Sequence, residues 1–595
     1  MWLEGFFFTG DMNLLNDEKR NKWLCVLLLI AAVIATSWPV LFMEVAKGHD
    51  LEFHLMRIEG ILSDASWRNL PVRIQSKWLD GYGYPVSVLY GDLFLYVGAI
   101  FRKLGFPIIT AYRLFVVCIN TATITIAYLS FRTYFKNRMI STLSAILYAC
   151  AAYRLVDEYV RSAVGETLTI VFLPAVAASV CMIFTKEDRA GRIKAAFLLA
   201  LTLTAVTCSH TLTTSMLAVV LPPVCLAGLF VFCDKGKRLV RITDFVTAAV
   251  SFVLMSAFFI VPFLDYYLTV DIAFASDEKM SIQKHGVRLR HLFDFFSDPF
   301  KTADGDIQKT PGLILMAVLV CAVIYVIVSL TRKVYFEKHR RIVFELCVSL
   351  VIIFMSSHIF PWDFIENNMP LGNILTAIEF PMRYLAFAIL LLSLLAGDLI
   401  YGFIKSRTGK EDANRILAAI CCVVCVLCIF NVVHLCIYNR TFEKKARFMQ
   451  EEDLGRWEYY AMDFQLKNTT VNDLDPGIKY EGLLDMEVLS RNSNDFLIRI
   501  DAGPEYGWVQ LPVFNYKYYY ACDLEDPSQV FEIHEGANRT VGVLLPGSYS
   551  GILHVYWREP ALWIMAKIIS LITFAGCIIY MVSGSFKKKK QEAAQ

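Results

Sequence analysis

Long apolar runs follow one another along most of the chain, and short polar stretches separate them. Most runs have about 18–24 residues, the length that a helix needs to cross a bilayer core of about 30 Å. The pattern therefore predicts a polytopic α-helical membrane protein with about twelve transmembrane helices. The runs cover residues 23–43, 110–131, 139–153, 167–184, 193–210, 212–233, 245–264, 312–330, 342–360, 383–404, 415–438 and 561–583.

Basic residues lie on every second connection between these runs. Each of these connections is short and has at least three Lys or Arg, from RTYFKNR at Arg132 to the tail that begins at Lys587. Because Lys and Arg are enriched in cytoplasmic loops, the pattern predicts a multi-pass plasma-membrane protein with cytoplasmic N- and C-termini. The first run follows Lys22 and is too long for the apolar region of a cleavable signal, so we interpret it as the first transmembrane helix.

The stretch 86–101 is apolar but short. Counting it as a span would reverse the orientation of every later helix. We therefore place it outside, as an interfacial or re-entrant helix, which is tolerated where protein buries its backbone. The domains follow from this choice. They are a transmembrane module at 1–438 with outer loops at 44–109, 154–166, 265–311 and 361–382, an extracytoplasmic domain at 439–560, and a last helix with a basic cytoplasmic tail at 561–595.

The outer domain has a different pattern, of short β-branched and aromatic runs. Turn residues such as Asp526-Pro527 and Pro546-Gly547 separate them, so the domain is predicted to be a C-terminal β-sandwich. The strand-like runs are 496–500, 507–514, 529–534, 540–545 and 551–557.

Composition supports the membrane class. The chain is 56% hydrophobic and 19% charged, with a mean hydropathy of +0.50, whereas soluble proteins average about 25% charged residues. The net charge of +2 gives no field for nucleic acid. Four cysteines resemble a metal motif, but they lie inside an apolar run, so we interpret them as packing residues rather than as zinc ligands. They are Cys421, Cys422, Cys425 and Cys428.

The densest polar cluster is GHDLEFHLMRIEGIL, from Gly48 in the first outer loop. At helical spacing, Asp50, His54 and Arg57 form one polar stripe beside an apolar stripe that starts at Leu51. An interfacial carboxylate suits a general base or a ligand for a hard cation, and an arginine suits a phosphate. The alternative is an ordinary amphipathic helix lying on the membrane surface.

The second outer loop, YRLVDEYVRSAVGE, contains two i,i+4 pairs, Arg154 with Glu158 and Asp157 with Arg161. They form either a mutually paired surface helix or further groups of the same site. Other polar residues leave the same choice open between structural and phosphate-binding roles. These are His210 at a turn between two spans, Arg288 and His291 in the third loop, and Arg383 where the fourth loop enters a span.

Taken together, these motifs resemble bacterial membrane proteins of the GT-C glycosyltransferase-like superfamily. The resemblance rests on HDLEFHLMRI, GYGYPVSVLYGDLFLY, YRLVDEYVRSAVGE, the Ser209-His210-Thr211 turn, IEFPMRYL and the β-rich segment with LLPGSYSGILHVYW. It covers nearly the whole chain. The nearest likenesses are a family labelled "6-pyruvoyl-tetrahydropterin synthase-related, membrane protein" and the membrane glycosyltransferases that decorate teichoic acids.

The resemblance implies an enzyme that takes a sugar from a polyprenyl-phosphate carrier at the outer membrane face. It implies that an acidic residue of the first outer loop acts as base or metal ligand. Asp50 matches that position, with Glu52, His54, Asp157 and Glu158 as supporting or metal candidates for Mg²⁺ or Mn²⁺. Basic residues of the loops would hold the carrier phosphate, and Arg57, Arg161 and Arg383 are the candidates.

We therefore expect a membrane glycosyltransferase whose acceptor is a cell-surface glycan or lipid. One alternative is a transporter or flippase for lipid-linked glycans, which would need charged groups along a path through the bilayer. The other alternative is a non-catalytic envelope protein whose β-domain binds polymer. The sequence names neither the sugar nor the acceptor, nor whether transfer is inverting or retaining.

Overall fold

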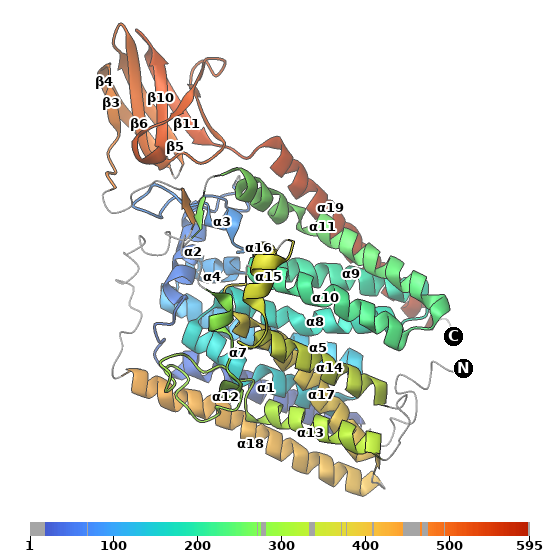
Figure 1. The fold of residues 1–595 in the computed structure, drawn as a ribbon. Helices are drawn as coiled ribbons and strands as arrows, with labels where there is room; N and C mark the ends of the chain where they lie inside the picture. Colours follow the sequence, from blue (N-terminus) through green and yellow to red (C-terminus); the bar gives the residue numbers. More distant parts are fainter. Residues whose placement is uncertain are drawn as a thin grey trace.

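A computed structural model describes residues 18–592, except 68, 271, 275–280, 332–338, 371, 377, 407–409, 444–463, 467–473 and 493. Helices form a bundle, and a β-rich domain lies beyond one end of it (Figure 1). The helices are α1 (Glu18–Phe42), α2 (Leu51–Asp64), α3 (Val86–Leu89), α4 (Leu95–Lys103), α5 (Ile108–Phe135), α6 (Arg138–Ala149), α7 (Ala152–Val156), α8 (Val164–Thr185), α9 (Arg189–Thr207), α10 (Thr211–Phe232), α11 (Arg238–Thr269), α12 (Leu289–Leu292), α13 (Leu313–Thr331), α14 (Arg340–Ser356), α15 (Trp362–Asn368), α16 (Gly372–Leu375), α17 (Leu385–Ser406), α18 (Lys410–Glu443) and α19 (Ala561–Glu592).

The chain is a multi-pass membrane protein. In its described part, 10 helices are long and apolar enough to cross a membrane, and they match ten of the predicted runs. The predicted run 342–360 is α14, with 17 residues. The predicted run 139–153 is α6 followed by α7 and a π-helix, Asp157–Arg161, with a bend of 45° between them.

The bend has local partners for its backbone. Asn431 donates a hydrogen bond to the Cys150 carbonyl at 3.0 Å, and the Ala152 amide donates to the Pro311 carbonyl at 3.2 Å. A broken helix is tolerated at membrane depth when protein supplies such bonds. The stretch 86–101, which we placed outside the bilayer, forms only the short helices α3 and α4, and neither is long enough to span.

The polar loops and the β domain gather at one end of the bundle. α2, α3 and α4 lie at the end nearest the β domain, whereas α19 starts beside that domain and finishes at the opposite end (Figure 1). The orientation of the termini with respect to the cell stays a prediction.

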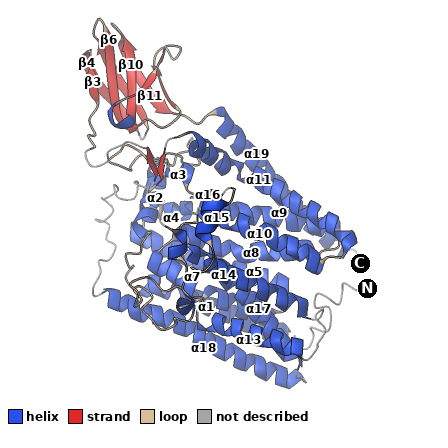
Figure 2. Ribbon diagram, viewed as in Figure 1, coloured by secondary structure: helices blue, strands red, loops and turns tan. Residues whose placement is uncertain are grey.

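The C-terminal domain consists of two antiparallel sheets (Figure 2), as the alternating pattern predicted. Apolar side chains of both sheets belong to one buried cluster. One sheet has the order β3-β6-β10-β9 and the other β4-β5-β11-β7-β8. Strands β3, β4 and β7 were missed from the sequence. The strands are β3 (Lys479–Glu481), β4 (Leu483–Asn492), β5 (Asp495–Ala502), β6 (Tyr506–Phe514), β7 (Tyr519–Asp523), β8 (Val530–Phe531), β9 (Ile533–Glu535), β10 (Thr540–Pro546) and β11 (Ser550–Trp557).

The sandwich packs on the first outer loop. The Phe514 amide donates to the Tyr82 carbonyl at 3.1 Å, and Trp78, Tyr84 and Tyr516 belong to the same buried apolar cluster. A small two-stranded sheet joins β1 (Ile272–Phe274) to β2 (Phe464–Leu466). The predicted boundary at 438 is slightly early, because α18 continues to Glu443. The predicted lead-in over 444–463 lies outside the described residues.

Candidate functional site

Asp50 begins α2 but does not cap it. It occupies the N-cap position, yet its side chain makes no capping hydrogen bond. An aspartate in this position ordinarily accepts a bond from the helix backbone. No hydrogen bond or ion pair to its carboxylate is found in the described part of the chain. Its own amide donates to the Arg161 carbonyl at 2.9 Å, which ties the first outer loop to the second.

The second loop brings three charged side chains together, and one of them, Arg161, lies close to Asp50. Nη1 of Arg161 lies 2.5 Å from Asp157 Oδ1 and 2.7 Å from Glu166 Oε2. Tyr153 donates its hydroxyl to Glu166 Oε1 at 2.6 Å. All four residues are buried. The predicted pair of Asp157 with Arg161 therefore forms, but inside the protein and with an additional carboxylate.

Arg383 reaches the same cluster from the fourth loop. It lies in the 3₁₀ turn Pro381–Tyr384, which begins after Phe380 and leads into α17. Its Nη1 lies 2.9 Å from Glu379 Oε2, and its Nε lies 3.4 Å from Glu166 Oε2. That Nε is buried and makes no hydrogen bond among the described residues. This nitrogen therefore faces Glu166 in an ion pair without completing a hydrogen bond.

The interpretation of α2 as a surface helix is wrong. Most of its 14 residues are buried, because α4 and the aromatic loop, residues 71–92, cover it. His54 and Arg57 therefore do not form a surface stripe with Asp50. Arg57 is 1% exposed and donates to the Gly91 carbonyl at 2.6 Å. Burial lowers the pKa of both His54 and Arg57.

Tyr90 separates Arg57 from the site. The Arg57 guanidinium lies 4.4 Å from the centre of the Tyr90 ring, and the His210 ring lies 5.5 Å from it on another side. Gly165 allows this close approach, since a Cβ there would lie 3.1 Å from both Tyr90 and His210. Arg57 thus supports Tyr90 through a cation–π contact, and the prediction that it contacts a phosphate has no support in this geometry.

The other predicted residues take structural positions. His210 accepts a hydrogen bond from the Thr213 amide and so caps α10. Glu52 pairs with Lys47 at 3.0 Å, and Glu158 pairs with Arg154 at 3.2 Å. His291 lies 2.7 Å from Asp304 in a separate cluster. Arg288 is exposed at the start of α12, with no contact to the Asp50 cluster among the described residues.

Burial raises the pKa of Asp50, and the nearby Arg161 and Arg383 oppose this shift. Asp50 is half-buried, so its carboxylate is partly desolvated and remains in the field of two cations. A raised pKa brings a carboxylate closer to the pH at which it can both accept and release a proton.

The candidate acids do not fit a divalent cation. A hard cation needs several oxygen ligands, and no group of three or more His, Cys, Asp or Glu placed to hold a metal occurs in the described residues. Asp157 is engaged by Arg161, Glu158 by Arg154 and Glu52 by Lys47. We therefore assign no step to Mg²⁺ or Mn²⁺.

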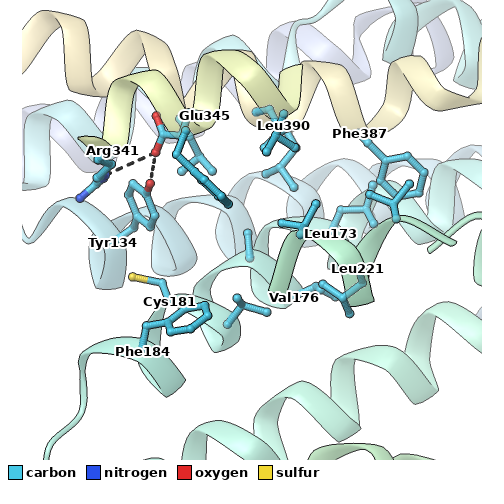
Figure 3. A pocket seen from close by; sticks show the side chains of 18 of the residues that line it. Tyr134, Leu173, Val176, Cys181, Phe184, Leu221, Arg341, Glu345, Phe387 and Leu390 are labelled. Carbon is cyan, nitrogen blue, oxygen red and sulfur yellow. Dashed lines mark hydrogen bonds and ion pairs between the residues drawn. The ribbon is translucent and has the colours of Figure 1, made fainter. Parts of the chain in front are cut away.

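An apolar pocket of about 170 Å³ starts one helical turn beyond Arg383. Phe387 and Leu390 on α17 face Leu173 and Val176 on α8 across it (Figure 3). At its far end, Arg341 and Tyr134 both contact Glu345. Arg341 also lies 2.7 Å from Asp398. The pocket is therefore apolar along its length and polar only where this cluster closes it.

Sequence reasoning missed three residues of this site. Glu166 ends the same motif that supplied Asp157 and Arg161, and its position after Gly165 was the available signal. Glu379 precedes Arg383 by four residues, an i,i+4 spacing. Tyr90 belongs to the motif GYGYPVSVLYGDLFLY, but nothing in its spacing distinguishes it from the other aromatic residues of that motif.

Comparison with known sequences does not assign the chain to a family. No family model matches the chain. An uncharacterised protein of Lactococcus lactis subsp. cremoris (strain MG1363) is 21% identical over 628 residues, which cover 97% of each chain. This identity does not assign the chain to the family labelled "6-pyruvoyl-tetrahydropterin synthase-related, membrane protein".

Solved structures with some similarity are membrane enzymes. The Archaeoglobus fulgidus oligosaccharyltransferase AglB, in complex with an inhibitory peptide and a dolichol-phosphate, has a TM-score of 0.41 and 14% identity, over 77% of this chain and 62% of that chain. ArnT from Cupriavidus metallidurans, bound to undecaprenyl phosphate, has a TM-score of 0.36 and 11% identity, over 69% and 74%. Mycobacterial arabinofuranosyltransferase AftD has a TM-score of 0.38 and 12% identity, over 72% and 27%. At these TM-scores the similarity carries no weight for function.

Proposed function

We propose that this protein is a membrane glycosyltransferase, which moves a sugar from a polyprenyl-phosphate-linked donor to a hydroxyl of a cell-surface polymer or lipid. One observation carries the proposal. Asp50 occupies a capping position without capping, and its carboxylate stays unbound within the field of Arg161 and Arg383. A half-buried, unengaged carboxylate beside guanidinium groups suits a general base next to an anionic leaving group.

The proposed reaction uses these groups in turn. Asp50 takes the proton of the acceptor hydroxyl, and the oxygen of that hydroxyl forms a bond to C1 of the sugar. The bond from C1 to the phosphate oxygen breaks, and the carrier phosphate leaves with the electron pair. The guanidinium of Arg383 stabilises the charge of that phosphate. Arg161 is already bound to two carboxylates, so its main part is to position the Asp50 backbone.

The apolar pocket beside Arg383 supports a donor with a hydrocarbon chain. It is lined along its length by side chains such as Leu173, Leu221 and Leu390. Part of an isoprenoid chain would be accommodated there with its phosphate near Arg383. The same lining disfavours a transporter, because a polar substrate crossing the bundle requires polar groups along its path.

The direct test is glycan analysis of a deletion strain complemented with wild-type or variant protein. The proposal predicts that one surface glycan loses a sugar substituent in the deletion strain. Wild-type protein restores the substituent, and Asp50→Asn does not. Unchanged surface glycans in the deletion strain would refute the proposal and leave the non-catalytic envelope role.

A further inference from the structure

A second, larger cavity of about 860 Å³ lies between α5, α8, α9, α11 and α19. Its volume is within the range of about 300–1,000 Å³ that is typical of ligand sites. Phe172, Met182 and Leu201 contribute to its apolar wall, and no residue of the Asp50 cluster lines it. It is therefore separate from the proposed transfer site.

The rim of this cavity includes residues on the outer surface of the bundle. Leu129 of α5 is 57% exposed, and Leu571 of α19 is 69% exposed. Exposed leucines on membrane-spanning helices face the hydrocarbon of the bilayer. A lipid chain can thus enter from the side, between α5 and α19.

The mouth of the cavity has an excess positive charge. Lys567 lines it and is paired with Glu559, but the same carboxylate is also bound by Nε of Arg73 at 2.8 Å. Two cations share Glu559, and Asp92, the other carboxylate near Arg73, is shared with Arg57, so one positive charge is in excess. Lys567 is partly exposed, whereas Arg73 is buried. Lysine is a compact point charge that binds phosphate oxygens well.

A buried hydroxyl adds a second recognition element. Thr204 lines the cavity, is 7% exposed, and has no hydrogen-bond partner for its Oγ1 among the described residues. A buried hydroxyl without a partner is costly. The Oγ1 atom is itself buried, so a rotation of the side chain turns the hydroxyl into the cavity and gives it a partner. Thr204 lies in the last turn of α9 and Lys567 in the second turn of α19. α19 begins on the β-domain side of the bundle (Figure 1), and α9 finishes there too, because Cys208 packs against Gly91 in the first outer loop.

We propose that this cavity binds one anionic glycerophospholipid. Its phosphate contacts Lys567, an ester carbonyl accepts a hydrogen bond from the Thr204 hydroxyl, and an acyl chain fills the apolar part. The ester favours a glycerophospholipid over a polyprenyl phosphate, which has no carbonyl below its phosphate. The bound lipid joins α19, which follows the β domain in the chain, to α5 and α9.

The test measures thermal unfolding of the purified full chain in a neutral detergent during titration with lipid. Phosphatidylglycerol is expected to raise the unfolding temperature, and phosphatidylcholine is not. Lys567→Gln is expected to weaken the apparent phosphatidylglycerol affinity about tenfold, since one charge-assisted hydrogen bond is lost. Thr204→Val is expected to weaken it severalfold. Lys103→Gln, which removes an exposed charge on α4, serves as the matched control and retains the wild-type affinity.

Equal stabilisation by phosphatidylcholine, or an unchanged affinity in Lys567→Gln, overturns the proposal. Stabilisation by undecaprenyl phosphate that exceeds that by phosphatidylglycerol and disappears in Lys567→Gln also overturns it, because it assigns the cavity to the carrier lipid. The readout involves no glycosyl transfer, so Asp50→Asn protein retains the phosphatidylglycerol response whether or not the proposed function is correct.

Discussion

Replacing Asp50 by Asn removes the proposed base with almost no change of shape. The wild-type carboxylate has no hydrogen bond to lose, since it neither caps α2 nor pairs with a neighbour in the described residues. Loss of a general base typically slows a reaction about 10²–10⁴-fold, which is about 2.7–5.5 kcal/mol in the activation barrier. We therefore expect transfer to fall by this factor while the level of folded protein is unchanged.

The change in unfolding temperature caused by this substitution distinguishes a functional from a structural carboxylate. Burial raises the pKa of Asp50 in the folded protein. The folded protein therefore binds this proton more tightly than the unfolded chain does. The resulting stabilisation is fully present below about pH 3.9, the pKa of an aspartate in the unfolded chain, and it is lost as pH rises through the pKa of Asp50 in the folded protein. The asparagine side chain of the variant does not ionise. The variant should therefore unfold at the same temperature as wild type in acid and at an equal or higher temperature at neutral pH.

The assay combines glycan analysis with thermal unfolding in detergent at acidic and neutral pH. Asp80→Asn is the matched control, because Asp80 is exposed in the same outer loop and has a φ of 53° that asparagine tolerates. Full glycosylation by a well-expressed Asp50→Asn protein would refute the catalytic role. A variant that is less stable at neutral pH would instead show that the carboxylate holds the fold together.

Three further predictions concern the arginines and the topology. Arg383→Ala should raise the KM for the donor and lower kcat/KM roughly ten- to hundredfold, since a charged interaction with phosphate is lost. Arg288→Ala, at an exposed position, should leave the steady-state kinetics unchanged. Equal kinetic effects of the two substitutions would contradict the assignment of Arg383. Arg161→Ala leaves the buried Asp157 without its cation and Glu166 with only Arg383, so it should cost about 3–5 kcal/mol in unfolding free energy. The exposed Arg290→Ala should cost less than about 1 kcal/mol in the same denaturation assay. An accessibility tag at Lys237 should be cytoplasmic and one near Asn494 outside, because of the alternating basic loops; an outside location at Lys237 would reverse the predicted orientation.

Much of the architecture follows from the sequence alone because it depends on local patterns. Apolar length predicts a membrane helix, since an unbonded backbone group costs several kcal/mol in hydrocarbon and a continuous helix avoids this cost. Alternation predicts the sandwich, since one face of each strand must be buried. Alternation missed β3, β4 and β7. Apolar length gave an incomplete picture where tertiary partners replace the local rule. The broken run 139–153 is an example, because Asn431 and Pro311 bond the backbone freed at its bend.

The composition of the site was only partly accessible to such reasoning. Helical spacing correctly paired Asp157 with Arg161 and Arg154 with Glu158, because i,i+4 neighbours meet on any helix. The same spacing wrongly grouped Asp50 with His54 and Arg57, because periodicity gives the face of a helix but not what covers it. The aromatic loop covers that face, and Arg57 became a support for Tyr90. Only the tertiary structure brings Glu166 and Arg383, distant in sequence, to the same carboxylate–guanidinium cluster, since no local pattern encodes contacts between separate helices.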